Sequence, residues 1–178
     1  MFTRHACRIG RRGGALAAAL AALALPGCAA PAVQPPATPR SLERLAAAAR
    51  TDIAGRPAPL APLLAGRAVL YFFRTDCEYC AAGLAQARAL AARPDGPALV
   101  LVSREGAARL REALGRALPR RLVVLSDSDG ALMDSALVTR FVPRIVAVAA
   151  FRVLLDRTGQ GGPGLAGAVR IASRSPAR

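Results

Sequence analysis

The sequence predicts an α/β domain in which a mixed central sheet of about five strands is flanked by helices. Short runs of Val, Leu, Ile and aromatic residues recur along the chain, and each has the length of one buried strand. Longer segments rich in Ala and Leu separate most of these runs and have the length of helices. Pro and Gly residues stand at many of the boundaries.

The region before the first strand is expected to hold one short helix and a loop. Ser41 is a candidate N-cap for a helix over residues 42–50, because its hydroxyl can accept a hydrogen bond from a free backbone N–H. Pro and Gly residues interrupt residues 52–67, which predicts a loop. The continuous apolar run 68–73 then predicts a buried central strand.

Helices and strands are expected to alternate after this strand. Residues 77–92 are rich in Ala and Leu, and Pro94 and Gly96 follow them, so they predict a helix with a clear end. A second helix, capped by Ser103 and running to residue 118, has leucines spaced four residues apart on one face. The other expected elements are strands at 98–102, 122–125, 145–148 and 153–155, and a short helix that follows the turn 127–130 and ends near residue 139.

Composition and charge exclude several classes of function. The chain has 178 residues, 25 basic residues, 11 acidic residues and a formal net charge of +14. Every basic residue is Arg, and the arginines are scattered, which indicates a bias of the whole composition; we therefore predict no specific nucleic-acid partner. The single histidine is His5, near the N-terminus, which argues against a His-dependent catalytic triad in the folded part.

Residues 1–27 have the composition of a secretory signal peptide. Arginines without any acidic residue precede an apolar run at 15–25, and small residues follow it. The run is shorter than the roughly 20 residues of a membrane-spanning helix. The Arg11–Arg12 pair also permits export by the twin-arginine route, although the residues after it do not support that route.

The segment Leu25-Pro26-Gly27-Cys28 resembles the bacterial lipobox. That resemblance implies that Cys28 becomes the first residue of the mature chain and carries a lipid, and it places the protein on the periplasm-facing side of a membrane in the bacterial cell envelope. The alternative is an ordinary signal peptide or an uncleaved anchor, with Cys28 incidental. Residues 28–40 are rich in Pro and are expected to form an extended tether between membrane and domain.

The folded domain is expected over residues 41–158. A tail rich in Gly and Arg follows at 159–178, and residues 165–173 within it could form a short helix.

Cys77 and Cys80 form a C-x-x-C pair at the junction of the first strand and the helix that follows it. The N-terminus of a helix favours thiolate over thiol, because free N–H groups and the helix dipole stabilise negative charge there. Residues three apart lie on one helix face, so a disulfide between them can form and break with little backbone movement. Cys77 lies nearer the helix end and is the candidate attacking thiol, and Cys80 is the candidate resolving thiol.

Other uses of the cysteine pair fit the sequence less well. A zinc site needs more ligands, and the domain has no other Cys or His, so no metal or other cofactor is predicted. A c-type haem site would require His where Ala81 stands. A purely structural disulfide stays open, although a bridge that closes so short a loop constrains the unfolded chain little.

Residues 69–80, Val-Leu-Tyr-Phe-Phe-Arg-Thr-Asp-Cys-Glu-Tyr-Cys, resemble the active-site strand and motif of the thioredoxin superfamily. Val142-Pro143, just before a predicted strand, is similar to the cis-proline segment of that superfamily. The resemblance covers residues 52–158. It implies a thioredoxin-like fold, protein thiols or disulfides as substrates, and a substrate-binding role for Val142 and Pro143.

Within the superfamily, the signal and the order of elements resemble the TlpA-like, membrane-tethered thiol–disulfide oxidoreductases, and residues 73–80 also resemble the TraF-like proteins of conjugative transfer. This sequence departs from the pattern at several positions. Asp76 replaces the usual Trp and is a candidate helix cap, and Gly83 replaces a Glu common in TlpA-like proteins. The turn at 149–152 lacks its usual Gly.

Charges beside Cys77 are expected to adjust its pKa. Asp76 and Glu78 oppose a second negative charge, whereas Arg74 favours it. We therefore expect an extracytoplasmic thiol–disulfide oxidoreductase with a reductant-like couple. The alternative is a catalytically degenerate thioredoxin-fold binding module in an envelope or conjugative-transfer assembly.

Overall fold

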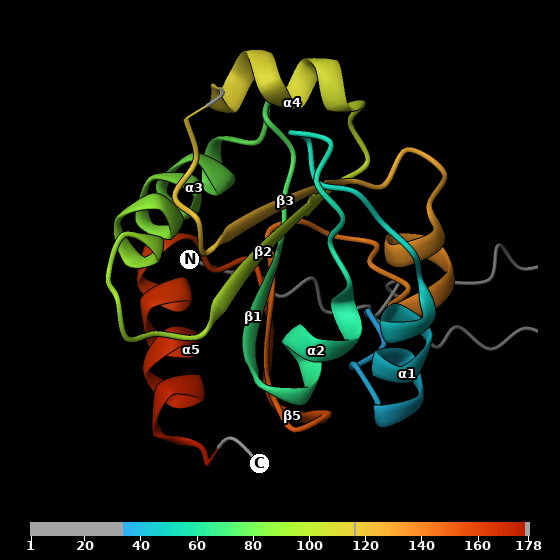
Figure 1. Ribbon diagram of the computed structural model, residues 1–178, viewed down its shortest axis with the longest axis vertical. Helices are drawn as coiled ribbons and strands as arrows, with labels where there is room; N and C mark the ends of the chain where they lie inside the picture. Colours follow the sequence, from blue (N-terminus) through green and yellow to red (C-terminus); the bar gives the residue numbers. More distant parts are fainter. Residues whose placement is uncertain (1–33, 116, 177–178) are drawn as a thin grey trace, which may run out of the picture. The chain divides into compact units, whose positions relative to one another are not determined.

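The computed structural model describes residues 34–115 and 117–176, and all of them belong to one compact unit. A five-stranded mixed sheet forms its centre, in the order β3-β2-β1-β4-β5 (Figure 1). β1 pairs in parallel with β2, and β2 pairs in parallel with β3, whereas β4 runs antiparallel to both β1 and β5. The strands are β1 Arg67–Phe72, β2 Ala98–Ser103, β3 Leu122–Ser126, β4 Arg144–Ala149 and β5 Arg152–Thr158. The predicted α/β class and all five expected strands are confirmed.

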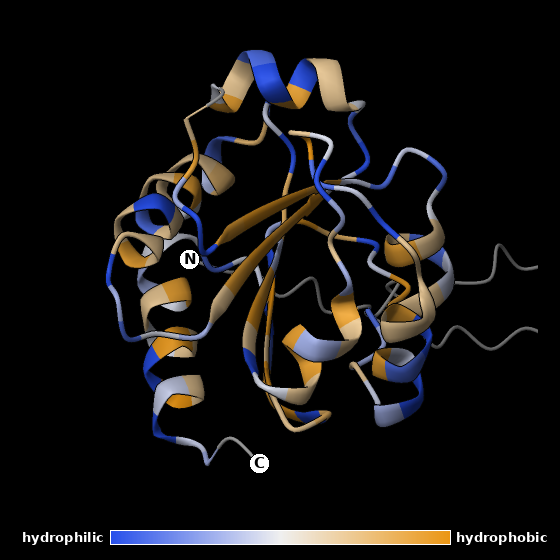
Figure 2. Cartoon of the chain, in the orientation of Figure 1, coloured by the Kyte–Doolittle hydropathy of each residue, from blue (hydrophilic) through white to orange (hydrophobic). Residues whose placement is uncertain are grey.

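The two faces of the sheet bury separate apolar clusters. Side chains alternate along β1, so Val69 and Tyr71 join one cluster while Leu70 and Phe72 join the other. Figure 2 shows that the central strands are strongly hydrophobic along their length. The first cluster is covered by α3 Glu78–Ala91, α4 Ala107–Leu114 and α5 Gly162–Arg174, and the second by α1 Pro39–Ala47, α2 Leu60–Ala65 and the π-helix η1 Ala131–Ala136.

Helix α1 begins earlier than the sequence predicts. Its N-cap is Thr38, whose hydroxyl accepts a hydrogen bond from the N–H of Ser41 at 3.2 Å, and the Ser41 hydroxyl accepts one from the N–H of Thr38 at 2.6 Å. Ser41 is therefore the third helical residue of a capping box, and its expected role as N-cap is wrong. The expected boundary between the tether and the folded domain, at residues 40 and 41, lies inside this helix.

Helix α2 lies within the expected loop 52–67. It supports the hairpin turn between β4 and β5, where the N–H groups of Ala150 and Phe151 donate to the carbonyls of Gly66 and Leu64, both at 3.0 Å. Ala150 and Phe151 have φ values of +48° and +58°, which residues other than glycine rarely adopt. These two hydrogen bonds help to hold a turn that lacks its usual glycine.

Three other helices differ from the expectation in their limits. Ser103 is the last residue of β2, and the N-cap of α4 is Gly106, so the expected capping role of Ser103 is wrong. Helix α4 ends at Leu114, before Gly115 at φ +71°. η1 has π-helical hydrogen bonding and ends at Ala136. α5 is longer than expected, and it packs against α3 and β4 because Leu165, Ala168 and Ala172 are fully buried.

The expected signal peptide and Cys28 lie outside the described residues. Within residues 34–115 and 117–176, no helix combines the length and the hydropathy that crossing a bilayer requires.

Candidate active site

The two cysteines lie at the N-terminus of α3 and are joined by a disulfide with a Cα–Cα distance of 5.2 Å. Cys77 occupies the N-cap position, and the N–H of Cys80 donates to its carbonyl at 2.9 Å. Cys77 is partly exposed at the edge of the core, whereas Cys80 is fully buried. Of the two bonded cysteines, only Cys77 is therefore accessible from solvent.

Asp76 pairs with Arg74 instead of capping α3. The Arg74 guanidinium donates from Nε to Oδ1 of Asp76 at 2.9 Å and from Nη2 to Oδ2 at 2.5 Å. These hydrogen bonds lower the pKa of Asp76 and raise the pKa of Arg74. The helix has no side-chain cap, so the expected capping role of Asp76 is wrong. Its negative charge stays beside Cys77, but the guanidinium largely offsets it.

Glu78 is the one acidic residue in the first turn of α3, and its side chain is exposed. Among the described residues it forms no ion pair. It therefore places an unpaired carboxylate next to Cys77 in the chain.

Glu105 fixes the loop before Cys77, a role that nothing in the local sequence suggested. Its carboxylate accepts hydrogen bonds from the N–H of Thr75 at 2.8 Å and from the Thr75 hydroxyl at 2.5 Å. The hydroxyl of Ser103 donates to the same carboxylate at 3.0 Å. Glu105 thus joins the end of β2 to the loop that presents the cysteines.

Tyr71 and Gly83 define the surroundings of Cys80. The fully buried hydroxyl of Tyr71 donates to the carbonyl of Cys80 at 3.2 Å. Burial raises the pKa of Tyr71 to about 12, so this hydroxyl is protonated at neutral pH. The phenol fills the space beside Gly83, and a Cβ atom at that position would overlap it. The Glu that the resemblance leads one to expect at position 83 therefore has no room.

The Val142–Pro143 peptide bond is cis, as the resemblance implies. The carbonyl of Pro143 accepts a hydrogen bond from the N–H of Gly159 at 2.8 Å, which holds the loop after β5 beside it. Val142 is partly buried and packs against both apolar clusters.

A groove of about 400 Å³ joins the loop before the cysteines to the cis-proline segment. Its lining includes Arg74 from the first loop, Glu105 from the β2–α4 loop, and Arg140 and Val142 from the loop before β4. The structure thus brings two groups of expected site residues to the same surface.

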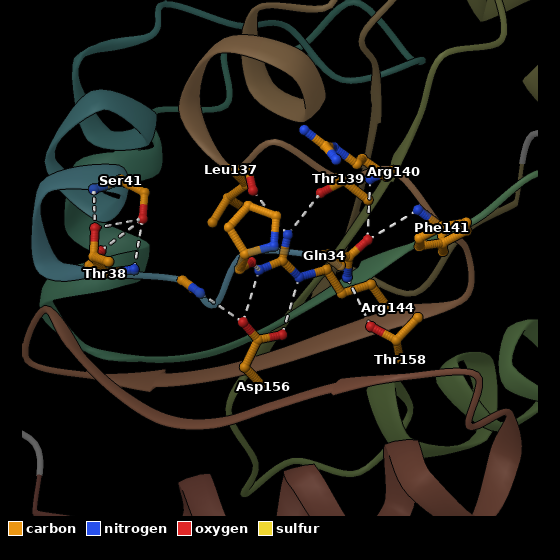
Figure 3. Close-up of polar contacts among 12 residues, drawn as sticks. Gln34, Thr38, Ser41, Leu137, Thr139, Arg140, Phe141, Arg144, Asp156 and Thr158 are labelled. Carbon is orange, nitrogen blue, oxygen red and sulfur yellow. Dashed lines mark hydrogen bonds and ion pairs between the residues drawn. The ribbon is translucent and has the colours of Figure 1, made fainter. Parts of the chain in front are cut away.

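Arg144 anchors the loop before β4, and Figure 3 shows its polar contacts. Its fully buried guanidinium donates to both carboxylate oxygens of Asp156, at 3.0 and 2.7 Å. It also donates to the carbonyl of Leu137 at 2.8 Å and to the hydroxyl of Thr139 at 3.2 Å. The loop that leads to Val142 is therefore anchored to β4 and β5.

No cluster of three or more Cys, His, Asp or Glu side chains suited to a metal ion occurs among the described residues.

Comparison with known proteins identifies the fold. No model of a known protein family matches the chain, and no curated protein sequence matches it. Several solved structures do. A secreted Mycobacterium tuberculosis disulfide oxidoreductase, described as homologous to E. coli DsbE, is 22% identical with a TM-score of 0.59, and the match covers 72% of this chain and 97% of that one.

Two further structures support the same fold. StoA from Bacillus subtilis is 19% identical with a TM-score of 0.54, and the match covers 68% of this chain and 94% of that one. The exposed lipoprotein thioredoxin Etrx1 of Streptococcus pneumoniae strain TIGR4 is 18% identical with a TM-score of 0.52, and the match covers 62% of this chain and 87% of that one. The chain therefore has a thioredoxin-like fold with a C-x-x-C disulfide at the N-terminus of α3.

Proposed function

We propose that this chain is an extracytoplasmic thiol–disulfide oxidoreductase of the membrane-tethered, TlpA-like type. The observation that carries the proposal is the unequal exposure of two bonded cysteines at a helix N-terminus within a thioredoxin-like fold. A dithiol that exchanges with protein substrates needs one accessible sulfur and one protected sulfur close by.

The proposed reaction starts from the reduced pair. The Cys77 thiolate attacks a substrate disulfide, forms a mixed disulfide with one substrate cysteine and releases the other as a thiolate. Cys80, as thiolate, then attacks Sγ of Cys77, which releases the second substrate thiolate and leaves the Cys77–Cys80 disulfide. Two electrons pass from the cysteine pair to the substrate, and an external dithiol must reduce the pair before the next turnover.

The residues around the pair have distinct parts in this reaction. The N-terminus of α3 stabilises the Cys77 thiolate, while Glu78 opposes it and the Arg74–Asp76 pair has a smaller net effect. Backbone groups of Val142, beside Pro143, would hold the substrate chain along the groove that Arg74 and Val142 line.

Glu78 supports a couple on the reducing side, because a less stable thiolate makes the dithiol a better electron donor. Equilibration of the full chain with glutathione tests this direction. We expect a reduction potential more negative than about −200 mV. A value near that of the strongest periplasmic oxidants, about −120 mV, would contradict it.

The proposal also includes lipidation of Cys28, which would hold the domain on the periplasm-facing side of an envelope membrane. The lipobox-like residues 25–28 support it. Wild-type chain should sediment with membranes, and Cys28→Ala should abolish this.

Reduction of insulin disulfides by the full chain, with dithiothreitol as electron source, tests the central activity. We expect turnover by the wild type and a loss of at least about 100-fold in Cys77→Ser, because Cys80 is too buried to replace it. Equal rates for the two proteins would favour a binding module that has kept the fold without the chemistry.

A further inference from the structure

The loop between η1 and β4 exposes two large apolar side chains within four residues. Val138 is 36% exposed and Phe141 is 46% exposed. Val138 also has a φ of +49°, a conformation that β-branched residues rarely adopt. Strained backbone of this kind clusters at functional sites, and here it accompanies an exposed apolar side chain.

Basic side chains accompany these two residues. Arg140 lies between them in the chain and is exposed, and Arg44 of α1 reaches the same end of η1, where its Nη1 donates to the carbonyl of Ser135 at 3.4 Å. Neither arginine has an ion-pair partner among the described residues. We call Arg44, Val138, Arg140 and Phe141 the loop patch; it combines apolar and basic groups as interfacial membrane contacts do.

The N-terminal end of the described chain is fastened to this patch (Figure 3). The side-chain carbonyl of Gln34 accepts hydrogen bonds from the N–H groups of Arg140 at 3.0 Å and Phe141 at 2.9 Å. Its amide nitrogen donates to the hydroxyl of Thr158 at 2.7 Å. The chain therefore enters the domain beside the loop patch.

The next residues of the N-terminal segment are held as firmly. The carbonyl of Pro35 accepts a hydrogen bond from Nη2 of the buried Arg144 at 3.0 Å. The N–H of Ala37 donates to Oδ2 of Asp156 at 2.6 Å. The entry point is thus fixed relative to the sheet by a buried ion pair.

Five residues lie between Cys28 and Gln34, so six residue-to-residue steps join their Cα atoms. A fully extended chain of that length spans at most about 21 Å. A lipid on Cys28 would consequently keep the loop patch within that distance of the headgroups.

We propose that the loop patch rests on the anionic headgroup surface of the membrane, with Val138 and Phe141 inserted between headgroups and Arg44 and Arg140 beside their phosphates. The inference rests on the anchor at Cys28 in the proposed function. It orients the domain, because the cis-proline loop and the groove beside it then lie near the membrane. The substrates would be disulfides held close to the bilayer.

The chain contains no Trp, so single Trp substitutions report on this contact without background. The test uses the full lipidated chain on phosphatidylcholine vesicles, with or without phosphatidylglycerol and with brominated acyl chains as quencher. Phe141→Trp is the reporter. Ile171→Trp is its control, because Ile171 is 40% exposed on α5, which covers the opposite face of the sheet.

We expect the emission of Phe141→Trp to shift to shorter wavelength and to be quenched on vesicles that contain phosphatidylglycerol, while Ile171→Trp changes little. Adding Arg140→Glu should weaken the quenching at least about twofold, because each arginine near an anionic surface changes partitioning roughly fivefold. The emission of Val138→Trp should shift and be quenched as that of Phe141→Trp is. Agreement between the two reporters would show that the result does not arise from a change in loop structure caused by one substitution.

An equal response of the Phe141 and Ile171 reporters on sedimented chain would overturn the loop patch and leave the anchor intact. A chain that stays in the supernatant would overturn both the anchor and the patch. Insulin reduction by the same preparation reports separately on the oxidoreductase activity, so a failure of the surface is distinguishable from a failure of the chemistry.

Discussion

The phenol of Tyr71 occupies the space that any side chain at Gly83 would need. Tyr71 extends from β1 toward the first turns of α3, where its hydroxyl binds the carbonyl of Cys80. Its ring stacks on Phe73, with centroids 6.3 Å apart. A single buried aromatic residue therefore sets how closely the cysteine-bearing helix approaches the central strand.

Gly83→Ala should destabilise the protein by about 1–3 kcal/mol, because the new Cβ must displace a fully buried ring. Gly167→Ala is the matched control, since Gly167 also lies inside a helix but has only the end of the Arg170 side chain within reach. There the better helix propensity of Ala should stabilise by about 0.5–1 kcal/mol. Urea unfolding of the oxidised proteins measures both; a Gly83→Ala protein as stable as the wild type would contradict this packing.

Tyr71 should also make stability depend on alkaline pH. Its folded-state pKa of about 12 lies above the ordinary value of a tyrosine, so the folded state keeps a proton that the unfolded state loses. The resulting stabilisation is fully present below about pH 10 and is lost as the pH rises toward 12.

Between pH 9 and 11 the wild type should lose about 1 kcal/mol of stability relative to Tyr71→Phe. The exposed Tyr79 provides the control, and Tyr79→Phe should follow the wild type over the same range. Parallel pH profiles for the wild type and Tyr71→Phe would show that Tyr71 is not a buried, protonated donor.

Glu105→Ala should loosen the loop before Cys77, because it removes the acceptor for both Thr75 hydrogen bonds. We expect a loss of about 1–2 kcal/mol and faster amide exchange at Thr75. Glu112→Ala, on the exposed side of the same α4 region, should stay within about 0.5 kcal/mol of the wild type. An unchanged rate of amide exchange at Thr75 in Glu105→Ala would contradict the role of Glu105 in holding this loop.

Asp156→Ala should cost about 3–5 kcal/mol, because it leaves the fully buried Arg144 guanidinium without a counter-charge. Asp134→Ala breaks an ion pair with Arg104 in which both side chains are about half exposed, and should cost no more than about 1 kcal/mol. Urea unfolding distinguishes them. Similar losses in both variants would mean that Arg144 is solvated in solution.

The sheet and the cysteine helix could be predicted because their signals are local. Each buried strand is a continuous apolar run, and the C-x-x-C spacing fixes which two sulfurs share a helix face. The helix α2 was missed because Pro57, Pro59 and Pro62 resemble a loop, although a proline in the first turn of a helix loses no intrahelical hydrogen bond. The sequence does not identify Thr38 as the N-cap of α1, because Ser41, three residues later, is an equally suitable N-cap residue.

The supporting contacts of the site could not be predicted, because they join residues distant in the chain. Glu105 lies 30 residues from Thr75, and Gln34 lies 107 residues from Phe141. Asp76 shows that prediction from sequence is also limited for residues close in the chain. An aspartate can cap a helix or form an ion pair, and only the position of Arg74 in space decides between them.

Trapping of mixed disulfides tests the central claim most directly, namely that the two sulfurs have unequal roles. Cell-envelope extracts are treated with full-length Cys80→Ser or Cys77→Ser and examined on non-reducing gels. Cys80→Ser should accumulate substrates that dithiothreitol releases, because Cys77 still attacks but nothing resolves the product. Cys77→Ser should trap none, since Cys80 is fully buried. Equal trapping by the two variants, or none by either, would contradict the account.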